Sequence, residues 1–533
     1  MGNRIEREWP SLLPAGDTHP YRTGAWRPQT TEWTATDMHV EGEIPADLNG
    51  VYLRNTENPL VPAMERYHPF DGDGMIHAIS FREGHAEYRN RFVRTEGLAV
   101  ELEAGAPQWS GLAESPLKSP RQDGWGARTR MKDASSTDIV VHNGMALSSF
   151  YQCGDLYQLD PITLEDKGRA SWNDTFPAAG ISAHAKVDER TGDMLFFNYQ
   201  TTYPYMHYGV LNAQGELSHY TPVPLPGPRL PHDMCFTDNY SVLNDCPLFW
   251  NEDLIAKGVY ATKFHRDMPT RLGVIPRFGT EKDIKWFECD ATYVLHWINA
   301  YEEGDEIIID GYFEYDPSPS LPPDASLEDR MFRFLDLFAM QSRPYRWRLN
   351  MRTGAVNEGP LSDTITEFGM INAQVAGKKY DTVYSVIPAH GWFGFEGLIK
   401  HNVVTGTEEN YHLPSGVYAS EAVFAPRPGG TREDDGYLIT FTMDVVNDAS
   451  HCQIFDAQNL SDGPIASILL PERICSGTHA GQFFGFFYYF SDNLHRPRPD
   501  RIIQRTYVYQ GAVPIFWGVD NQSLLKGLHF RDI

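Results

Sequence analysis

Residues 398–413, LIKHNVVTGTEENYHL, carry the pattern that decides the fold. A hydrophobic segment ends at Asn402, and a Thr-Gly step at Thr405 and Gly406 reverses the chain into a second short strand-like segment. This pattern is typical of a tight hairpin between two antiparallel strands. Six further segments show related patterns, and they begin at His77, Tyr157, Tyr208, Arg271, Trp347 and Cys452.

Hairpins that recur along a chain with variable insertions indicate a repeated unit, and each blade of a β-propeller is such a unit. We therefore predict an all-β protein, a seven-bladed β-propeller with one hairpin in each blade. The alternative is a multi-sheet β protein with ordinary hairpins. The choice between them depends on whether the chain also carries residues that must meet on a common axis.

Size and composition favour one compact body. The chain has 533 residues, 41% of them hydrophobic, and its 37 Pro and 45 Gly are spread rather than concentrated in a linker. We predict a single propeller domain over residues 1–533, with an N-terminal extension at 1–45 and insertions at 225–345. Apolar residues repeat with a helical period in residues 326–340, which predicts a helix there.

The charge balance excludes some functions. Lys and Arg number 45 against 71 Asp and Glu, a net charge of −26 that repels nucleic acids and anionic membranes. We find no apolar run of transmembrane length, no signal peptide, and charges interrupting the apolar segment 246–269, so at most weak membrane association is expected. The six Cys form no CxxC pair, which favours a reducing, cytoplasmic location.

Four histidines stand at sequence positions typical of strand ends: His184 in ISAHAKVD, His232 in LPHDMCF, His296 in YVLHWINAYEEGDE and His479 in SGTHAGQFF. They are too far apart for a zinc finger or a helical His-Glu-x-x-His site. Only a closed, roughly symmetric fold can point one side chain from each of several units at a common axis. Taken singly, each is better explained as a buried, hydrogen-bonded histidine than as a ligand.

Together the four histidines predict an all-imidazole metal site. Imidazole suits zinc, copper, iron and nickel, so the ligands alone leave the metal open. Other classes of site have little support. We find no Gly-x-Ser-x-Gly hydrolase motif and no phosphate-binding glycine loop with its Lys-Ser/Thr step.

Several motifs resemble those of the carotenoid cleavage oxygenase family, non-haem iron enzymes that split conjugated double bonds. The clearest are GVYLRNTENPL (residues 50–60) and YHPFDGDGMIHAISF (67–81). Four more match in order and position, at residues 299–310, 367–372, 397–406 and 421–439. The resemblance covers most of the chain, from about residue 45 to 490.

The resemblance implies a propeller capped by loops and helices that form a substrate tunnel. It implies Fe(II) bound by His184, His232, His296 and His479, with Glu367 and Glu421 orienting these ligands. Where relatives carry a third glutamate, this chain has Gln152, which removes a negative charge and predicts a higher iron potential or weaker iron retention. Phe70 and Trp297 are candidates for the tunnel lining, although each is better explained as a core residue.

The activity implied is a dioxygenase reaction that cleaves a conjugated C=C bond of a hydrophobic carotenoid or apocarotenoid with O2, giving two carbonyl products. A tyrosine and a lysine that grip a phenol in stilbene-cleaving members are not evident here. Cleavage of aryl-alkenes such as stilbenes, isoeugenol or vinylphenols remains the alternative. A polyene isomerase or hydrolase and a non-catalytic propeller are the remaining hypotheses.

Overall fold

The computed structural model describes residues 2–123, 131–250, 253, 256, 262–315, 317, 324, 341–390 and 393–483. The chain divides into two units, Met1–Phe486 and Phe487–Ile533, and every described residue lies in the first. The predicted helix at 326–340 lies outside the described residues. No helix among the described residues is both apolar enough and long enough to cross a lipid bilayer.

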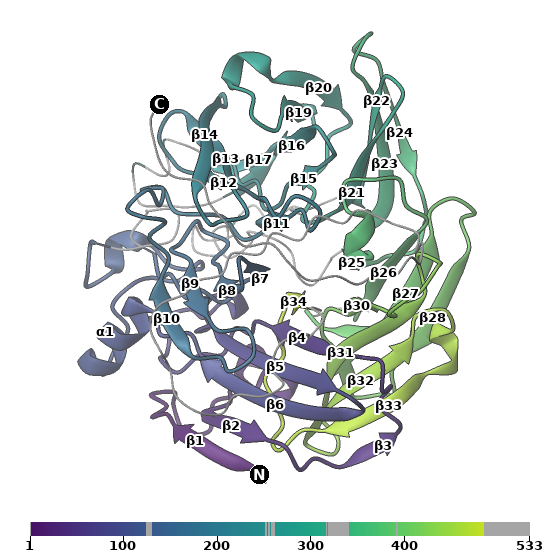
Figure 1. Ribbon diagram of the computed structural model, residues 1–533. Coiled ribbons are helices and arrows are strands. Elements are labelled where there is room, and N and C mark those ends of the chain that lie inside the picture. The colour runs from purple at the N-terminus through teal and green to yellow at the C-terminus, as the bar shows by residue number, and fades with distance from the viewer. Residues whose placement is uncertain are drawn as a thin grey trace, which may run out of the picture. The chain divides into compact units, whose positions relative to one another are not determined.

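Seven four-stranded units, here called blades 1 to 7, follow one another around a common centre in the described part of the chain, and further strands join some of them into larger sheets (Figure 1). From the innermost strand outward, blades 1 to 3 contain the following strands. Blade 1 has β34 (Ala480–Phe483), β4 (Gly50–Arg54), β5 (Met75–Arg82) and β6 (His85–Phe92). Blade 2 has β7 (Ile139–His142), β8 (Met145–Ser148), β9 (Tyr157–Leu159) and β10 (Asp166–Arg169). Blade 3 has β11 (Lys186–Val187), β12 (Met194–Tyr199), β13 (Tyr205–Leu211) and β14 (Leu217–Pro224).

The remaining blades repeat this order. Blade 4 has β15 (Cys235–Phe236), β16 (Tyr240–Asp245), β19 (Thr270–Pro276) and β20 (Lys285–Cys289). Blade 5 has β21 (Trp297–Glu303), β22 (Glu306–Phe313), β23 (Arg343–Asn350) and β24 (Val356–Pro360). Blade 6 has β25 (Glu367–Met370), β26 (Thr382–Pro388), β27 (Phe395–Asn402) and β28 (Glu408–His412). Blade 7 has β30 (Val423–Pro426), β31 (Gly436–Asp444), β32 (Ala449–Asp456) and β33 (Pro464–Leu469).

Strands from the two ends of the described chain close the ring. β34 supplies the innermost strand of blade 1, where Ala480 lies opposite Arg54. The N-terminal strands β1 (Arg4–Glu8) and β2 (Thr31–Ala35) extend blade 1 outward, while β3 (Val40–Gly42) pairs with the outer strand of blade 7. Blades 6 and 7 are joined through β29 (Val417–Ala419). The innermost strands β7, β11, β15 and β21 remain short sheet edges on the side that faces the centre.

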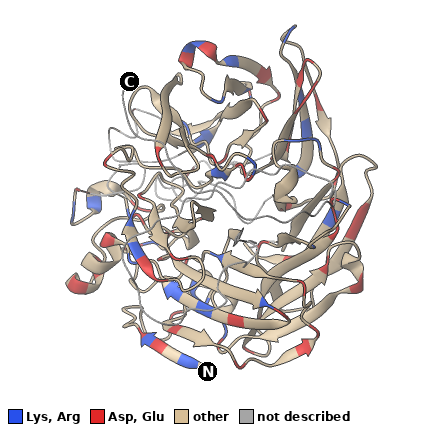
Figure 2. Cartoon of the chain, in the orientation of Figure 1, with Lys and Arg blue, Asp and Glu red and all other residues tan. Residues whose placement is uncertain are grey.

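The seven predicted hairpins are the two outer strands of the seven blades, from β5–β6 in blade 1 to β32–β33 in blade 7. The prediction of a seven-bladed propeller is therefore confirmed. Outer strands such as β6 alternate in burial. Figure 2 shows residues of both charge signs along β1 and β6. Inner strands such as β31 are buried on both faces, so their sequences are continuously apolar or small.

Short elements connect the blades. A separate hairpin, β17 (Leu248–Trp250) and β18 (Thr262–Phe264), interrupts blade 4. The described 3-10 helices are Pro20–Arg22, Gly24–Trp26, Pro69–Asp71, Pro116–Lys118, Glu281–Asp283, Ala373–Val375 and Leu460–Asp462.

One helix, α1 (Glu96–Ala104), was not predicted from the sequence. The Thr95 side chain caps its start by accepting from the Leu98 amide, and Gly105 ends it with a φ of 65°. These capping residues identify a helix that its weak apolar periodicity hides.

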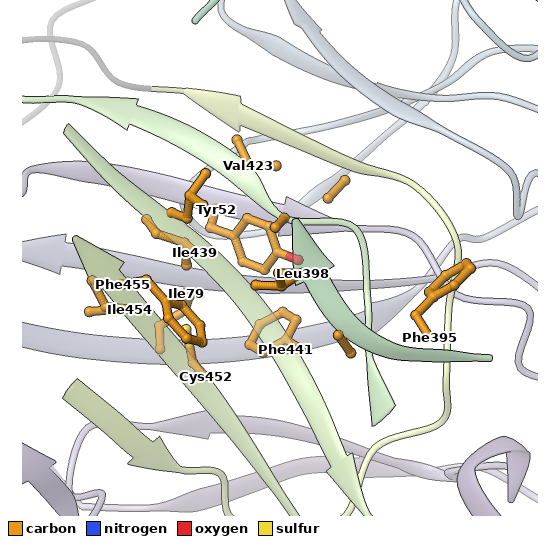
Figure 3. Packing of buried hydrophobic residues seen from close by; sticks show 14 of the residues in the cluster. Tyr52, Ile79, Phe395, Leu398, Val423, Ile439, Phe441, Cys452, Ile454 and Phe455 are labelled. Atoms are coloured by element: carbon orange, nitrogen blue, oxygen red, sulfur yellow. The ribbon is translucent and has the colours of Figure 1, made fainter. Parts of the chain in front are cut away.

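The largest core lies between blades 6, 7 and 1 (Figure 3). Phe441 on β31 is fully buried there, with its ring centroid 4.9 Å from that of Tyr52.

We expect Phe441→Ala to lower the free energy of unfolding by about 3–5 kcal/mol, because the surrounding residues cannot completely fill the cavity that the lost ring leaves. Urea unfolding would measure this loss. Val446→Ala at an exposed turn is the control, and an equal effect of both variants would contradict the packing account.

Candidate metal centre

The four predicted histidines meet at the centre of the propeller. His296 and His479 directly precede the innermost strands of blades 5 and 1, and His184 and His232 stand two and three residues before those of blades 3 and 4. One nitrogen from each lies within 4.8 Å of the others, and all four side chains are buried. The four innermost strands that follow these histidines thus begin at the same level of the ring, which places one imidazole from each on the axis.

The spacing of the nitrogens suits a single ion. Nε2 of His184 lies 3.2 Å from Nε2 of His232. Two ligands about 2.1 Å from an ion and at right angles to each other lie about 3.0 Å apart, close to this separation. Nε2 of His296 is buried and has no hydrogen-bond partner among the described residues. A buried, unpartnered nitrogen aimed at three other imidazoles fits a metal ligand.

Carboxylates from the three remaining blades hold the opposite ring nitrogens. Nδ1 of His184 lies 2.8 Å from Oδ2 of Asp138, which directly precedes β7. Nδ1 of His296 lies 2.7 Å from Oε2 of Glu367, the first residue of β25. Because each Nδ1–H donates to a carboxylate, each Nε2 is left with a lone pair for a metal.

The third carboxylate holds its histidine less tightly. Oε2 of Glu421 lies 3.6 Å from Nδ1 of His479 and accepts a 2.6 Å bond from the Ala480 amide. Each carboxylate therefore stands on a blade adjacent to that of its histidine. His232 is flanked on both sides by histidine-bearing blades, so it has no such neighbour.

The site is electrostatically prepared for a cation. Burial, together with the neighbouring imidazoles, holds the pKa of His184 and of His296 well below the ordinary value, and burial lowers the pKa of His232 to about 3. Burial alone would lower the pKa of His479, but the Glu421 carboxylate raises it instead. Burial raises the pKa of Asp138 to about 6. Three imidazoles are therefore held neutral, the form that binds a metal.

The structure places Gln152 away from these hydrogen bonds. Its side chain is buried, and neither amide atom hydrogen-bonds to any of the four histidines in the described residues. Asp138 supplies a carboxylate from the same blade instead, and the sequence analysis missed it. The available signal was its place in SSTDIVV, directly before an innermost strand, as His296 stands directly before another.

The two candidate tunnel residues lie in different surroundings. Phe70 is half-buried in a group of rings, with centroids 5.8 Å from Tyr151 and 5.6 Å from Phe393. Tyr151 in turn lies 6.5 Å from the His232 ring, so this group adjoins the histidines. Trp297 packs in the core of blade 5 against Trp347, with ring centroids 5.3 Å apart, and it also lines a cavity along the axis.

Phe368 is a site residue that the sequence analysis did not single out. Its ring centroid lies 4.7 Å from that of His479 and 4.6 Å from that of His296. Its φ of 54° is a left-handed conformation that is costly for an aromatic residue. The Glu367 carboxylate accepts from the Phe368 amide at 2.7 Å, which helps to hold this conformation. The ring thereby shields two imidazoles from water.

A buried acid, Glu57, also adjoins the site and was missed. Its Oε1 accepts a 2.8 Å bond from Oγ1 of Thr478, the residue before His479. Its Oε2 has no hydrogen-bond partner among the described residues. Burial raises the pKa of Glu57 to about 7 from 4.5, so the ionised form is disfavoured in the folded state.

This shift predicts a pH-dependent stability. Between pH 4.5 and 7 the unfolded chain releases the Glu57 proton before the folded protein does, so stability falls as pH rises through this window. We compare the free energy of unfolding of Glu57→Gln with that of the unchanged protein. We expect the difference between them to grow by about 3 kcal/mol in favour of the variant as pH rises from 4.5 to 8. Denaturant unfolding of the metal-free proteins at both pH values measures this difference. A difference independent of pH would contradict the assignment.

The sequence is similar to those of known oxygenases over most of its length. The family model described as RPE65, retinal pigment epithelial membrane protein, matches residues 26–484. A carotenoid 9,10(9',10')-cleavage dioxygenase of Phaseolus vulgaris is 30% identical over 502 residues, covering 87% of this chain and 89% of its own. A lignostilbene-alpha,beta-dioxygenase isozyme of Sphingomonas paucimobilis is 29% identical, covering 86% and 95%.

A solved structure of a related enzyme has the same fold. The cobalt-substituted apocarotenoid oxygenase of Synechocystis superposes with a TM-score of 0.75 at 26% identity, covering 86% of this chain and 97% of its own. Fold and relatives together define an enzyme of the β-propeller oxygenase class. More particularly, the chain belongs to the carotenoid cleavage oxygenase family.

Proposed function

We propose that this protein is a non-haem iron dioxygenase in which His184, His232, His296 and His479 bind Fe(II). The observation that carries the proposal is the convergence of four buried imidazoles within 4.8 Å, two of them donating to carboxylates at 2.7 and 2.8 Å. Four imidazoles, each neutral once it binds the ion, would leave the charge of a divalent ion uncancelled. When bound, the ion would supply open positions and electrons for activating dioxygen.

The chain's own residues would prepare the substrate. Phe70, Tyr151 and Phe393 pack as a group of rings beside His232, and we place a conjugated alkene against this apolar group, which would keep water away. Phe368 shields His296 and His479 on another side. Holding the reacting bond in one orientation beside the histidines is the main contribution that such a surface makes to the rate.

The proposed substrate is a carotenoid or apocarotenoid cleaved into two carbonyl products. The Phaseolus relative named for carotenoid cleavage supports this assignment. The Sphingomonas relative named for lignostilbene cleavage supports aryl-alkenes as a second candidate. We also propose a reducing, cytoplasmic location, because Cys235, Cys246 and Cys452 are buried and form no disulfide among the described residues.

Product analysis under 18O2 tests the proposal. The iron-loaded protein is incubated with a panel of apocarotenoids, stilbenes and phenylpropenoids, and the masses of the products are measured by mass spectrometry. Labelled carbonyl products from one class would support the dioxygenase function and identify the substrate. Isomerised or hydrolysed polyenes without the label would replace it with the isomerase or hydrolase hypothesis. No product from any compound, with iron bound, would favour a non-catalytic propeller.

A further inference from the structure

A cavity of about 480 Å³ runs along the innermost strands of the propeller. At one end it reaches His184, His296 and His479. At the other end it is lined by Asn143 and Gly144 in the turn after β7, by Glu189 after β11, and by Ile371, Ala373 and Ala376 after β25. Since all these strands run away from the histidines, this axial cavity connects the proposed metal site to the opposite rim of the ring.

The charged residues that line the axial cavity are predominantly acidic. They are Asp138, Glu189, Asp233 and Glu421, against the single base Lys186. Lys186 pairs with Asp233 at 2.7 Å, so three carboxylates keep no lysine or arginine partner within the cavity lining. One of them, Glu189, is exposed at the rim, and two adjoin the histidines. Such a charge distribution attracts cations toward the inner end.

The other described surroundings of the histidines suit a cation poorly. The rings of Phe70, Tyr151 and Phe393 approach the cluster near His232 and do not line the axial cavity. A hydrated divalent ion must keep oxygen atoms around it until its ligands replace them, and aromatic rings offer none. The axial cavity has a largely apolar lining, but it also offers the carboxylates of Asp138, Glu189 and Glu421, the amide oxygen of Asn143, and room for water.

We propose that the axial cavity is the route by which the divalent cation enters and leaves the histidine site, with Glu189 attracting it at the rim. This rests on the proposed metal site. The alkene and the ion would then reach the histidines from different directions. An enzyme so arranged can be loaded without exposing its apolar surface to water.

Cobalt uptake tests the route without any substrate. Metal-free, full-length protein is mixed rapidly with Co(II), and binding is followed by the visible absorption of the bound ion. Glu189→Lys reverses a charge at the rim, and Glu281→Lys is its control on the exposed 3-10 helix Glu281–Asp283 of blade 4. We expect Glu189→Lys to slow uptake about tenfold at low salt, less at high salt, and the control to match the unchanged protein.

A second pair of variants tests the passage itself. Ala373→Trp fills the rim of the cavity from the half-buried helix Ala373–Val375, and Ala355→Trp adds the same ring at an exposed turn of blade 5. A plug slows uptake and release equally, because both follow one path, so the equilibrium affinity stays unchanged. We expect Ala373→Trp to slow both Co(II) uptake and Co(II) release, and Ala355→Trp to change neither rate.

The outcomes separate the two proposals. Unchanged rates in both Glu189→Lys and Ala373→Trp would overturn the axial route while leaving the metal site intact. Slower uptake with an equally weakened affinity would also overturn it, because the variants would then have damaged the site. Failure of the unchanged protein to bind Co(II) would instead contradict the proposed metal site.

Discussion

His296→Ala is expected to weaken binding of Fe(II) or Co(II) by more than about 100-fold, since even changes beside a ligand cost 10- to 100-fold. Nε2 of His296 is buried, has no other partner among the described residues, and faces the other three imidazoles. Alanine removes this nitrogen and also leaves the Glu367 carboxyl without its 2.7 Å donor. Alkene cleavage should fall below detection with the metal.

Metal titration by calorimetry and elemental analysis of the purified protein measure this loss. The control is His207→Ala, because His207 lies on β13, is half-buried, and interacts with Asn198 rather than with the cluster. Retention of one tightly bound metal ion by His296→Ala would show that the cluster is a set of structural histidines.

Asp138→Asn is the second large expected effect, a 10- to 100-fold loss of metal affinity. The amide keeps the shape of the side chain and still accepts from Nδ1 of His184, but it removes the negative charge that makes the imidazole a stronger ligand. Asp138→Glu should recover part of the affinity, because it restores the charge at a shifted position.

Gln152→Glu distinguishes this account from the one suggested by the sequence. If the third carboxylate belongs at position 152, restoring it should strengthen metal binding. The Gln152 amide bonds to no histidine among the described residues, so we expect a change of less than about threefold, within RT ln 3 or about 0.6 kcal/mol. A marked gain in Gln152→Glu, with no loss in Asp138→Asn, would contradict the role given to Asp138.

Much of the fold could be predicted because its determinants are local. Each outer hairpin is encoded in a dozen residues, and all seven were found in the sequence. α1 was missed because its apolar face is weak, although Thr95 and Gly105 mark its ends. The closure by β34 could not be read locally, since Ala480 pairs with Arg54 at the opposite end of the described chain.

The site was predictable to the extent that a symmetric ring makes it so. The four histidines follow from resemblance and from their places at strand ends. The partner of each histidine depends on which blades are adjacent and on side-chain reach, which hairpin patterns do not encode. The place of Phe368 beside the histidines could not be predicted, because it depends on the left-handed backbone angle of Phe368 itself. Such strain has no sequence pattern of its own.

The most direct test of the central claim is an anomalous scattering map at the iron edge, from crystals of the protein grown anaerobically with Fe(II). The account predicts one strong peak about 2.0–2.3 Å from Nε2 of each of His184, His232, His296 and His479. A peak bound elsewhere, or no peak at the centre of the ring in protein that contains iron, would contradict it.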